Sequence, residues 1–172
     1  MRSFLRPLIL VAGLAVVALA SAQGGTPPVV SLKVAIPKVM AGKAFQAVVT
    51  ITFPEGLHGY QNPPTDPSLI PITVTAADRT CTVLKVSYPK GVPTQVGGES
   101  KPINVYQGTV KIPVSIQAPA KLGKALVKLS IGYQECNAQS CFPPGTATAE
   151  ATVTVIKKTS PPKLMVGGKG KR

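Results

Sequence analysis

Cys136 and Cys141 are the two side chains of this sequence whose type and spacing best suit chemistry. They are two of its three cysteines, and they lie in the segment YQECNAQSCFPP, residues 133–144. The four residues between them are small or polar and suit a tight turn, which brings the Cα atoms into the range of about 4.4–6.8 Å that a disulfide requires. Three interpretations follow: a disulfide that exchanges with partner thiols, a structural disulfide, or a pair of thiolate ligands for a metal.

The small size of the ring favours exchange over a structural role. Closing so short a loop stabilises a fold by only about 2 kcal/mol, less than a cross-link between distant strands. Exchange requires an accessible sulfur and an attacking thiolate. No histidine or lysine adjoins the pair, and the carboxylate of Glu135 raises the pKa of a neighbouring thiol. We therefore expect a partner protein to supply the attacking thiolate, or the fold to bring in activating groups.

A metal site would have to recruit His58, the one histidine of the sequence. His58 and two thiolates make a three-ligand copper or zinc site, but no fourth ligand stands at a recognisable spacing. A packed or exposed histidine near the end of a strand is the simpler interpretation. We expect no metal and no cofactor.

Residues 1–22 have the pattern of a signal peptide. Arg2 and Arg6 precede an almost wholly apolar run over residues 8–20, and Ala20-Ser21-Ala22 supplies a small-x-small cleavage pattern. An apolar run of about 13 residues is too short to span a bilayer, which takes about 20. We therefore expect cleavage near Ala22 and a periplasmic or otherwise extracytoplasmic chain with no further transmembrane segment. Close cysteines tend to be oxidised in such a compartment.

The remaining chain is strongly basic. Removing Arg2 and Arg6 with the signal peptide lowers the formal net charge from +13 to +11. Six basic residues lie in residues 157–172, and the other lysines are scattered singly. Because aromatic residues make up only 5% of the chain, platforms for base stacking are few. We expect a solvated basic surface, a cationic tail suited to an acidic envelope, and no nucleic-acid partner. No motif supports a hydrolase or a kinase.

Runs of β-branched residues organise the rest of the chain. Seven of them predict strands, over residues 29–36, 44–53, 70–76, 80–88, 109–117, 124–133 and 146–156. No run beyond the signal peptide has helical periodicity. This pattern predicts an all-β fold, an immunoglobulin-like antiparallel β-sandwich of about seven to eight strands. The sandwich is expected over residues 23–158, followed by a disordered basic tail over residues 159–172.

Three details of the strands carry expectations. Pro113, inside the run 109–117, predicts an edge strand or a bulge. By alternation, Cys81 shares a face with Val83 and Lys85, opposite the more apolar face of its strand. We therefore expect Cys81 to be a half-buried, unreactive thiol, with an intermolecular link or shuffling with the pair as the alternative. Tyr60, like the other tyrosines that close strands, is expected to pack at the rim of the sandwich.

The cysteine segment resembles the N-terminal periplasmic domain of the thiol:disulfide interchange protein DsbD. The matching residues are Tyr133-Gln134-x-Cys136, a short spacer, and Cys141-x-Pro143-Pro144. Two other stretches are similar to the family in order and spacing: EGLHGY at 55–60 with PSLIP at 67–71, and VYQGTVKIPV at 105–114. The resemblance covers residues 29–156 and implies an immunoglobulin-like sandwich that relays reducing equivalents, as a protein-disulfide reductase does.

The resemblance also implies roles for individual residues. Cys141 would form the mixed disulfide with a partner, and Cys136 would resolve it. Four neighbours would shape the site: Tyr133, Gln134, Phe142 and Pro143. Two departures from the family are visible: the cap-loop stretch at 97–102 has no aromatic residue and only Glu99 as an acid, and the spacer between the cysteines is a residue shorter.

The partners that the resemblance implies are redox proteins. The electron donor would be a membrane-embedded protein like DsbD or CcdA, or a thioredoxin-fold extracytoplasmic protein, as in cytochrome c biogenesis. The membrane-spanning and thioredoxin domains of DsbD do not follow in this sequence, so we expect a stand-alone domain that acts in trans. The alternative is a non-catalytic immunoglobulin-like binding or accessory module whose disulfide is structural.

Overall fold

The computed structural model describes residues 26–97 and 100–157. The predicted signal peptide and the predicted tail at 159–172 lie outside these residues. The described part of the chain forms eleven strands: β1 (Val29–Val34), β2 (Lys38–Met40), β3 (Ala44–Thr52), β4 (His58–Tyr60), β5 (Thr73–Ala76), β6 (Thr82–Val86), β7 (Val92–Thr94), β8 (Ile103–Gln107), β9 (Thr109–Gln117), β10 (Gly123–Tyr133) and β11 (Gly145–Ile156). No helix among the described residues is long and apolar enough to cross a membrane.

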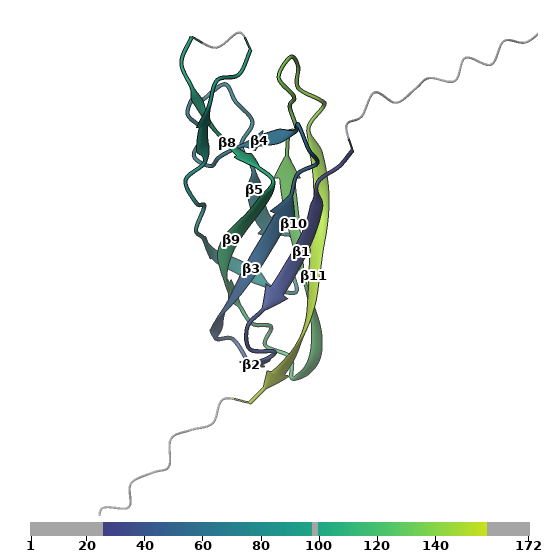
Figure 1. Ribbon diagram of the computed structural model, residues 1–172. Helices are drawn as coiled ribbons and strands as arrows, with labels where there is room; N and C mark the ends of the chain where they lie inside the picture. Colours follow the sequence, from purple (N-terminus) through teal and green to yellow (C-terminus); the bar gives the residue numbers. More distant parts are fainter. Residues whose placement is uncertain (1–25, 98–99, 158–172) are drawn as a thin grey trace, which may run out of the picture.

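Eight of these strands make two four-stranded sheets that pack face to face (Figure 1). One sheet is ordered β1-β3-β9-β6 and the other β2-β11-β10-β5. Neighbouring strands within them run antiparallel, apart from β2 and β11, which are parallel. The all-β sandwich is therefore confirmed, and each of the seven predicted runs overlaps one of its strands.

Alternating side chains build the core between the two sheets. The inward positions of β9 and β10 have no exposed surface, while Lys111 and Leu126 on the outer faces are exposed. Each such apolar side chain contributes roughly 1.5–3 kcal/mol when it is fully buried. The inward residues are Ile112, Val114, Ile116, Val127, Leu129 and Ile131.

Pro113 lies in an inner strand, so the prediction of an edge strand or bulge for it was wrong. β9 runs between β3 and β6, and Pro113 is opposite Val48 of β3. The β6 ladder ends at Val86↔Val114, and beyond it the Ser87 N–H donates to the Pro113 carbonyl at 2.9 Å. A proline has no N–H to return the second hydrogen bond of such a pair. The inner strand tolerates it because the missing donor falls where the β6 ladder has ended.

A bulge in β6 corrects the expected faces of that strand. The register shifts between Val83 and Lys85, and Leu84, between them, is 52% exposed. Because a bulge adds one residue, the inward face changes from odd to even positions. Val83 and Val86 therefore both pack on the core, together with Cys81. Cys81 is buried rather than half-buried; its thiol is free, and burial raises its pKa.

A third sheet, ordered β4-β8-β7, lies at one end of the sandwich (Figure 1). Gly59, the middle residue of β4, faces the main core: a Cβ there would lie 2.9 Å from Phe53 Cζ and 3.1 Å from Ile72 Cδ1. Because side chains alternate along a strand, His58 and Tyr60 point the other way. This small sheet places both of them beside the loop that carries the cysteine pair.

Candidate functional site

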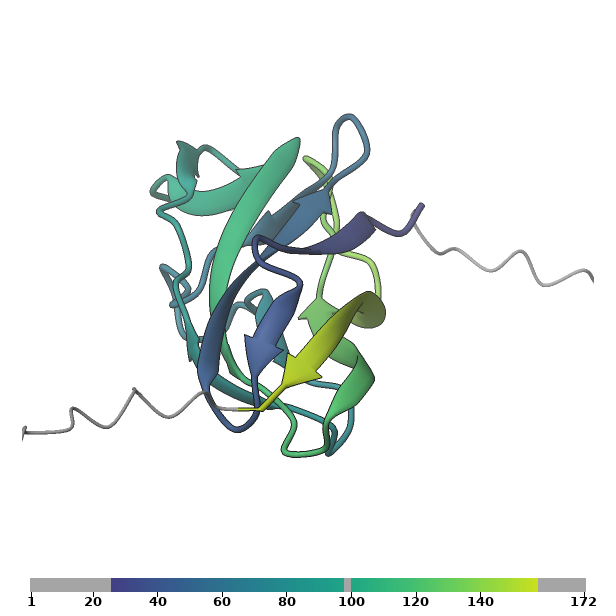
Figure 2. The same ribbon diagram turned by 90° about the horizontal axis from the view of Figure 1, so that it is seen from below.

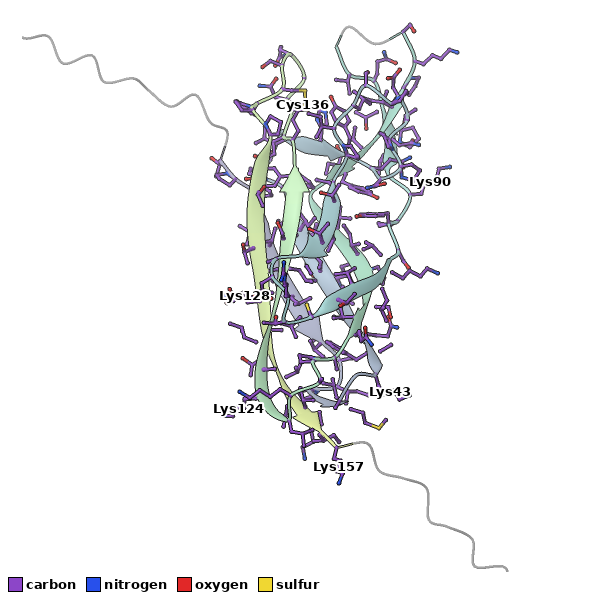
Figure 3. The ribbon with its side chains drawn as sticks, turned by 180° about the vertical axis from the view of Figure 1, so that it is seen from behind. Lys43, Lys90, Lys124, Lys128, Cys136 and Lys157 are labelled. Atoms are coloured by element: carbon purple, nitrogen blue, oxygen red, sulfur yellow. A yellow bond between two sulfur atoms is a disulfide. The ribbon has the colours of Figure 1, made fainter. Side chains whose placement is uncertain are left out.

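The cysteine pair lies in the loop between the two longest strands. β10 ends at Tyr133, β11 begins at Gly145, and Cys136 and Cys141 between them form a disulfide with a Cα–Cα distance of 3.9 Å. The two cysteines also form an isolated antiparallel bridge, and their Cα atoms are closer than the separation expected from the sequence. Figure 3 shows Cys136 at one end of the sandwich.

The two sulfurs have different environments. Cys136 has no exposed surface, and it packs in a small apolar cluster with Tyr60, Ile103 and Val105. Cys141 is exposed. A thiolate from outside therefore has access to Cys141, whereas Cys136 is shielded by the fold. This asymmetry suits a pair in which one sulfur is attacked and the other leaves.

Strand β4 fixes Cys136 by backbone pairing. The His58 N–H donates to the Cys136 carbonyl at 3.0 Å, and the Cys136 N–H donates to the His58 carbonyl at 2.9 Å. The cysteine segment thus extends the β4-β8-β7 sheet by one residue. Because Tyr60 is two residues after His58, its side chain emerges on the same face, next to the disulfide.

The hydroxyl of Tyr60 contacts both sulfurs. Its oxygen lies 3.3 Å from Cys136 Sγ and 3.3 Å from Cys141 Sγ. Disulfide sulfurs carry no hydrogen, so the hydroxyl is the donor in the oxidised state. Tyr60 is itself only 4% exposed. The sequence predicted a rim-packing role for Tyr60 and missed this contact; the one signal was its place in the EGLHGY stretch that resembled the family.

His58 lies two residues before Tyr60 on the same face of β4, and the two side chains pack together. The two rings meet edge to face with centroids 5.9 Å apart. Burial lowers the pKa of His58, and its Nε2 atom is buried with no hydrogen-bond partner among the described residues. Those residues hold no group of three histidine, cysteine or acidic side chains that could bind a metal. His58 is 7% exposed and its ring contacts Tyr60, so it is packed inside the fold.

Glu135, directly before Cys136, is a buried carboxyl. It is 3% exposed, its Oε1 atom has no hydrogen-bond partner among the described residues, and burial raises its pKa. Burial also raises the pKa of Tyr133, and the nearby Glu135 carboxylate adds to that shift. Because its pKa is raised, Glu135 keeps its proton to a higher pH than an exposed glutamate does, and in that neutral form it does not repel a thiolate that forms close by.

The four predicted site-shaping residues all belong to the cysteine loop or its edges. Gln134 Nε2 donates to the Phe142 carbonyl at 3.1 Å, and the Phe142 N–H donates to the Glu135 carbonyl at 2.8 Å. Tyr133 lies over Gly145, where a Cβ would come within 2.8 Å of its ring. Pro143 is exposed. Gln134 and Phe142 thus tie the two arms of the loop together around the disulfide.

The hairpin formed by β7 and β8 also contacts the cysteine loop. A Cβ on Gly97 would lie only 2.6 Å from the Ala138 carbonyl oxygen, so the two loops touch there. Val96 packs against the cluster that contains Cys136. Val96, directly before the expected cap-loop stretch at 97–102, thus brings an aliphatic side chain against Cys136 and its neighbours. Glu99 of that stretch lies outside the described residues.

A cavity of about 550 Å³ adjoins the site between this hairpin and the loop at 54–57. His58, Val96 and Ala138 line it, so it reaches from beside Tyr60 to the cysteine loop. Its other walls include Phe53 and Leu57. The arrangement offers a partner both an exposed cysteine, Cys141, and a largely apolar recess beside the cysteine loop.

A sequence model of the family "Thiol:disulfide interchange protein DsbD, N-terminal" matches residues 27–153. The chain belongs to this family. Among solved structures, the DsbD N-terminal domain of Neisseria meningitidis in the reduced form is 16% identical, with a TM-score of 0.47, over 73% of this chain and 85% of that one. The N-terminal periplasmic domain of ScsB from Proteus mirabilis is 9% identical, with a TM-score of 0.49, over 69% of this chain and 43% of that one. No curated protein sequence matches the chain.

Proposed function

We propose that this chain is an extracytoplasmic thiol–disulfide exchange protein that relays reducing equivalents through Cys136 and Cys141 to or from partner redox proteins. The observation that carries the proposal is the contact of one buried hydroxyl, on Tyr60, with both sulfurs of a disulfide whose second cysteine, Cys141, is exposed. Membership of the DsbD N-terminal family supports it.

Reduction of the pair begins at the exposed sulfur. A partner thiolate attacks Cys141 Sγ, a mixed disulfide forms between the partner and Cys141, and Cys136 leaves as a thiolate. A second partner thiolate then attacks the partner's own sulfur in the mixed disulfide and releases Cys141. The partner dithiol is oxidised to a disulfide, and this chain gains two electrons and takes up two protons. In the opposite direction, Cys141 attacks an oxidised acceptor, and Cys136 resolves the mixed disulfide.

Tyr60 supplies a hydrogen-bond donor for the thiolate, an activating group that no sequence neighbour of the cysteine pair provides. A thiolate on Cys136, which has no exposed surface, is disfavoured by desolvation unless a donor stabilises it. The Tyr60 hydroxyl already lies at hydrogen-bond distance from that sulfur. It therefore stabilises the leaving thiolate in the first step and the nucleophilic Cys136 thiolate in the reverse one.

The proposed setting is outside the cytoplasm. The signal-peptide pattern of residues 1–22 supports export, and a disulfide between Cys136 and Cys141 suits an oxidising compartment outside the cytoplasm. The proposed partners are a membrane-embedded donor like DsbD or CcdA, or a thioredoxin-fold protein, each acting in trans. Their reactive thiol would approach Cys141 beside the cavity that His58 and Val96 line.

Electron transfer from a reduced thioredoxin-fold protein tests the proposal. The oxidised chain is mixed with one equivalent of reduced thioredoxin, quenched at intervals and alkylated, and the thiols of both proteins are counted by mass spectrometry. The proposal predicts that two thiols appear on this chain as two disappear from thioredoxin. In a separate reaction with an oxidised thioredoxin-fold acceptor, the Cys141 thiolate of the Cys136→Ser variant should attack the acceptor disulfide and be trapped as a mixed disulfide, because Cys136 is no longer there to resolve it. If the native disulfide stays closed until the protein unfolds, it is a structural disulfide of a binding module.

A further inference from the structure

Three segments meet at the end of the sandwich opposite the cysteine loop. They are residues 36–43, which contain β2, residues 118–124 around the β9–β10 turn, and residues 155–157 at the end of β11. Met40 of β2 lies beside Ile156 of β11, and the Ala41 N–H donates to the Ile156 carbonyl at 2.9 Å. The Ala118 N–H donates to the Lys43 carbonyl at 2.8 Å, which joins the β9–β10 turn to the β2–β3 turn. Figure 2 views the molecule from this side, with the end of β11 in yellow.

This surface is rich in exposed lysines, and we refer to it as the lysine pole. Residues 36–43, 118–124 and 155–157 contain no acidic residue. Asp78 lines a cavity together with one pole lysine, Lys121, and Arg79 lines that cavity as well. Figure 3 shows Lys43, Lys124 and Lys157 at one end of the molecule and Cys136 at the other. The lysines of the pole are Lys38, Lys43, Lys121, Lys124 and Lys157.

Exposed aliphatic side chains lie between these lysines. The described residues contain nine large hydrophobic side chains that are exposed, and four of them belong to the three pole segments. Leu122 at the tip of the β9–β10 turn is 54% exposed, and Ile36 before β2 is 69% exposed. Met40 and Ile156, which are neighbours in the sheet, are 43% and 41% exposed.

We propose that the lysine pole binds the surface of an anionic phospholipid membrane. Lysine ammonium groups gain favourable energy near anionic headgroups, while aliphatic side chains enter the boundary between headgroups and acyl chains. A nucleic-acid surface would favour aromatic side chains for stacking, and the three pole segments contain none. The combination of net positive charge with protruding aliphatic residues therefore fits a lipid surface best. This binding does not depend on the proposed exchange reaction.

Docking at the pole would set the height of the cysteine pair above the membrane. β10 and β11 run the length of the sandwich, from Gly123↔Val155 at the pole to Tyr133↔Gly145 at the cysteine loop. Eleven residues at about 3.3 Å each span roughly 35 Å. The exposed Cys141 would then face away from the membrane, which favours a thioredoxin-fold partner in the extracytoplasmic space over a membrane-embedded donor.

Vesicle binding by matched charge variants tests the inference. The exported chain, with residues 158–172 retained throughout, is sedimented with neutral phosphatidylcholine vesicles and with vesicles that contain phosphatidylglycerol. The pole variant removes four lysines: K38Q, K43Q, K121Q and K124Q. The control variant removes four exposed lysines elsewhere: K33Q, K85Q, K90Q and K111Q. Circular dichroism and thermal unfolding confirm that both variants fold.

The inference predicts binding to the phosphatidylglycerol vesicles only. A lysine at such a surface is worth roughly fivefold in affinity, which corresponds to about 1 kcal/mol, so the pole variant should lose on the order of 100-fold or more. The control variant should lose under about fivefold. A second variant, L122S with I156S, should bind more weakly at high salt, where the aliphatic contribution dominates.

Three results would overturn the inference. An equal loss in the pole and control variants would mean that diffuse charge, not the pole, attracts the protein. Equal binding to neutral and anionic vesicles would mean that the lysines do not attract the protein to the membrane. No vesicle binding, with retention on a DNA oligonucleotide that the pole variant abolishes, would assign the pole to nucleic acid instead.

Discussion

The Tyr60 hydroxyl lies 3.3 Å from Cys141 Sγ, although the two residues are eighty-one positions apart in the chain. Two local features produce the contact. Gly59 lets β4 lie directly on the core, and the backbone pairing of His58 with Cys136 then fixes the distance from β4 to the disulfide. The hydroxyl therefore stands where negative charge develops when the disulfide opens.

Removing this hydroxyl should slow the opening of the disulfide. A hydrogen bond to a charged group contributes about 1.5–3 kcal/mol, so Tyr60→Phe should reduce the rate of reduction by dithiothreitol roughly 10- to 100-fold. Stopped-flow reduction followed by thiol detection measures the rate. Tyr106→Phe is the matched control, because the Tyr106 hydroxyl is also inside the fold but donates to the Pro89 carbonyl at 2.6 Å, away from the sulfurs. Equal rates for wild type and Tyr60→Phe would contradict the assigned role.

The two thiols should differ in reactivity when each stands alone. In the Cys136→Ser variant the remaining thiol of the pair, Cys141, is exposed, and in Cys141→Ser the remaining thiol of the pair, Cys136, is fully buried; Cys81 is a buried free thiol in both variants. We expect Cys141 to be alkylated by iodoacetamide at least roughly tenfold faster, since access and thiolate character set the rate. Unfolding in guanidinium should bring the two rates together. A faster reaction at Cys136 in the folded protein would reverse the assignment of the attacked sulfur.

Stability should depend on pH through Glu135. Its pKa is raised in the folded state, so the folded protein binds the proton more tightly than the unfolded chain does. The stabilisation is fully present below the unfolded value of about 4.3 and is lost as pH rises through the folded pKa. Glu135→Gln keeps a neutral side chain at every pH.

Denaturant unfolding of this variant gives a directional test. Glu135→Gln should match the wild type near pH 4 and be more stable at pH 7 to 8, by about 1–3 kcal/mol for relief of a buried, unpaired carboxylate. Glu150→Gln is the control, because Glu150 is a half-exposed partner of Lys128 and such pairs are worth only about 0–1 kcal/mol. A Glu135→Gln protein that is less stable at pH 8 than at pH 4, relative to wild type, would contradict the raised pKa.

The close approach of Gly59 to the core predicts a link between packing and the site. A methyl group at this position meets Phe53 at 2.9 Å and Ile72 at 3.1 Å, so Gly59→Ala should cost about 1–3 kcal/mol of stability through overpacking. Because β4 must shift to accept it, exchange should slow as it does in Tyr60→Phe. Thermal unfolding and the dithiothreitol assay measure the two effects. A loss of stability with an unchanged rate of reduction would mean that the packing of β4 does not determine the position of Tyr60 at the disulfide.

Much of the fold could be predicted because buried and exposed side chains alternate regularly along a long strand. The run 109–117 alternates between buried and exposed side chains over nine residues, and that period identifies both the strand and its inward face. The cysteine pair was equally visible, since its spacing and flanking residues are local in the sequence. What alternation alone could not reveal was the bulge at Leu84, where one unpaired residue reverses the faces of β6.

The remainder of the site depends on contacts that short segments make. β4 has three residues, too few to show a period, and the importance of Tyr60 arises from its pairing partner far along the chain. Glu135 was visible as a charge beside Cys136, but its burial follows from tertiary packing. Pro113 shows the same limit, because only the end of the β6 ladder explains why an inner strand accepts it.

The midpoint potential of the Cys136–Cys141 pair tests the central claim most directly. The folded protein is equilibrated across a series of thiol buffers and alkylated, and mass spectrometry gives the fraction of disulfide at each potential. The account predicts a midpoint between roughly −180 and −270 mV, within the range of exchange proteins. A midpoint well below about −300 mV would place the bond among structural disulfides and contradict the proposed relay.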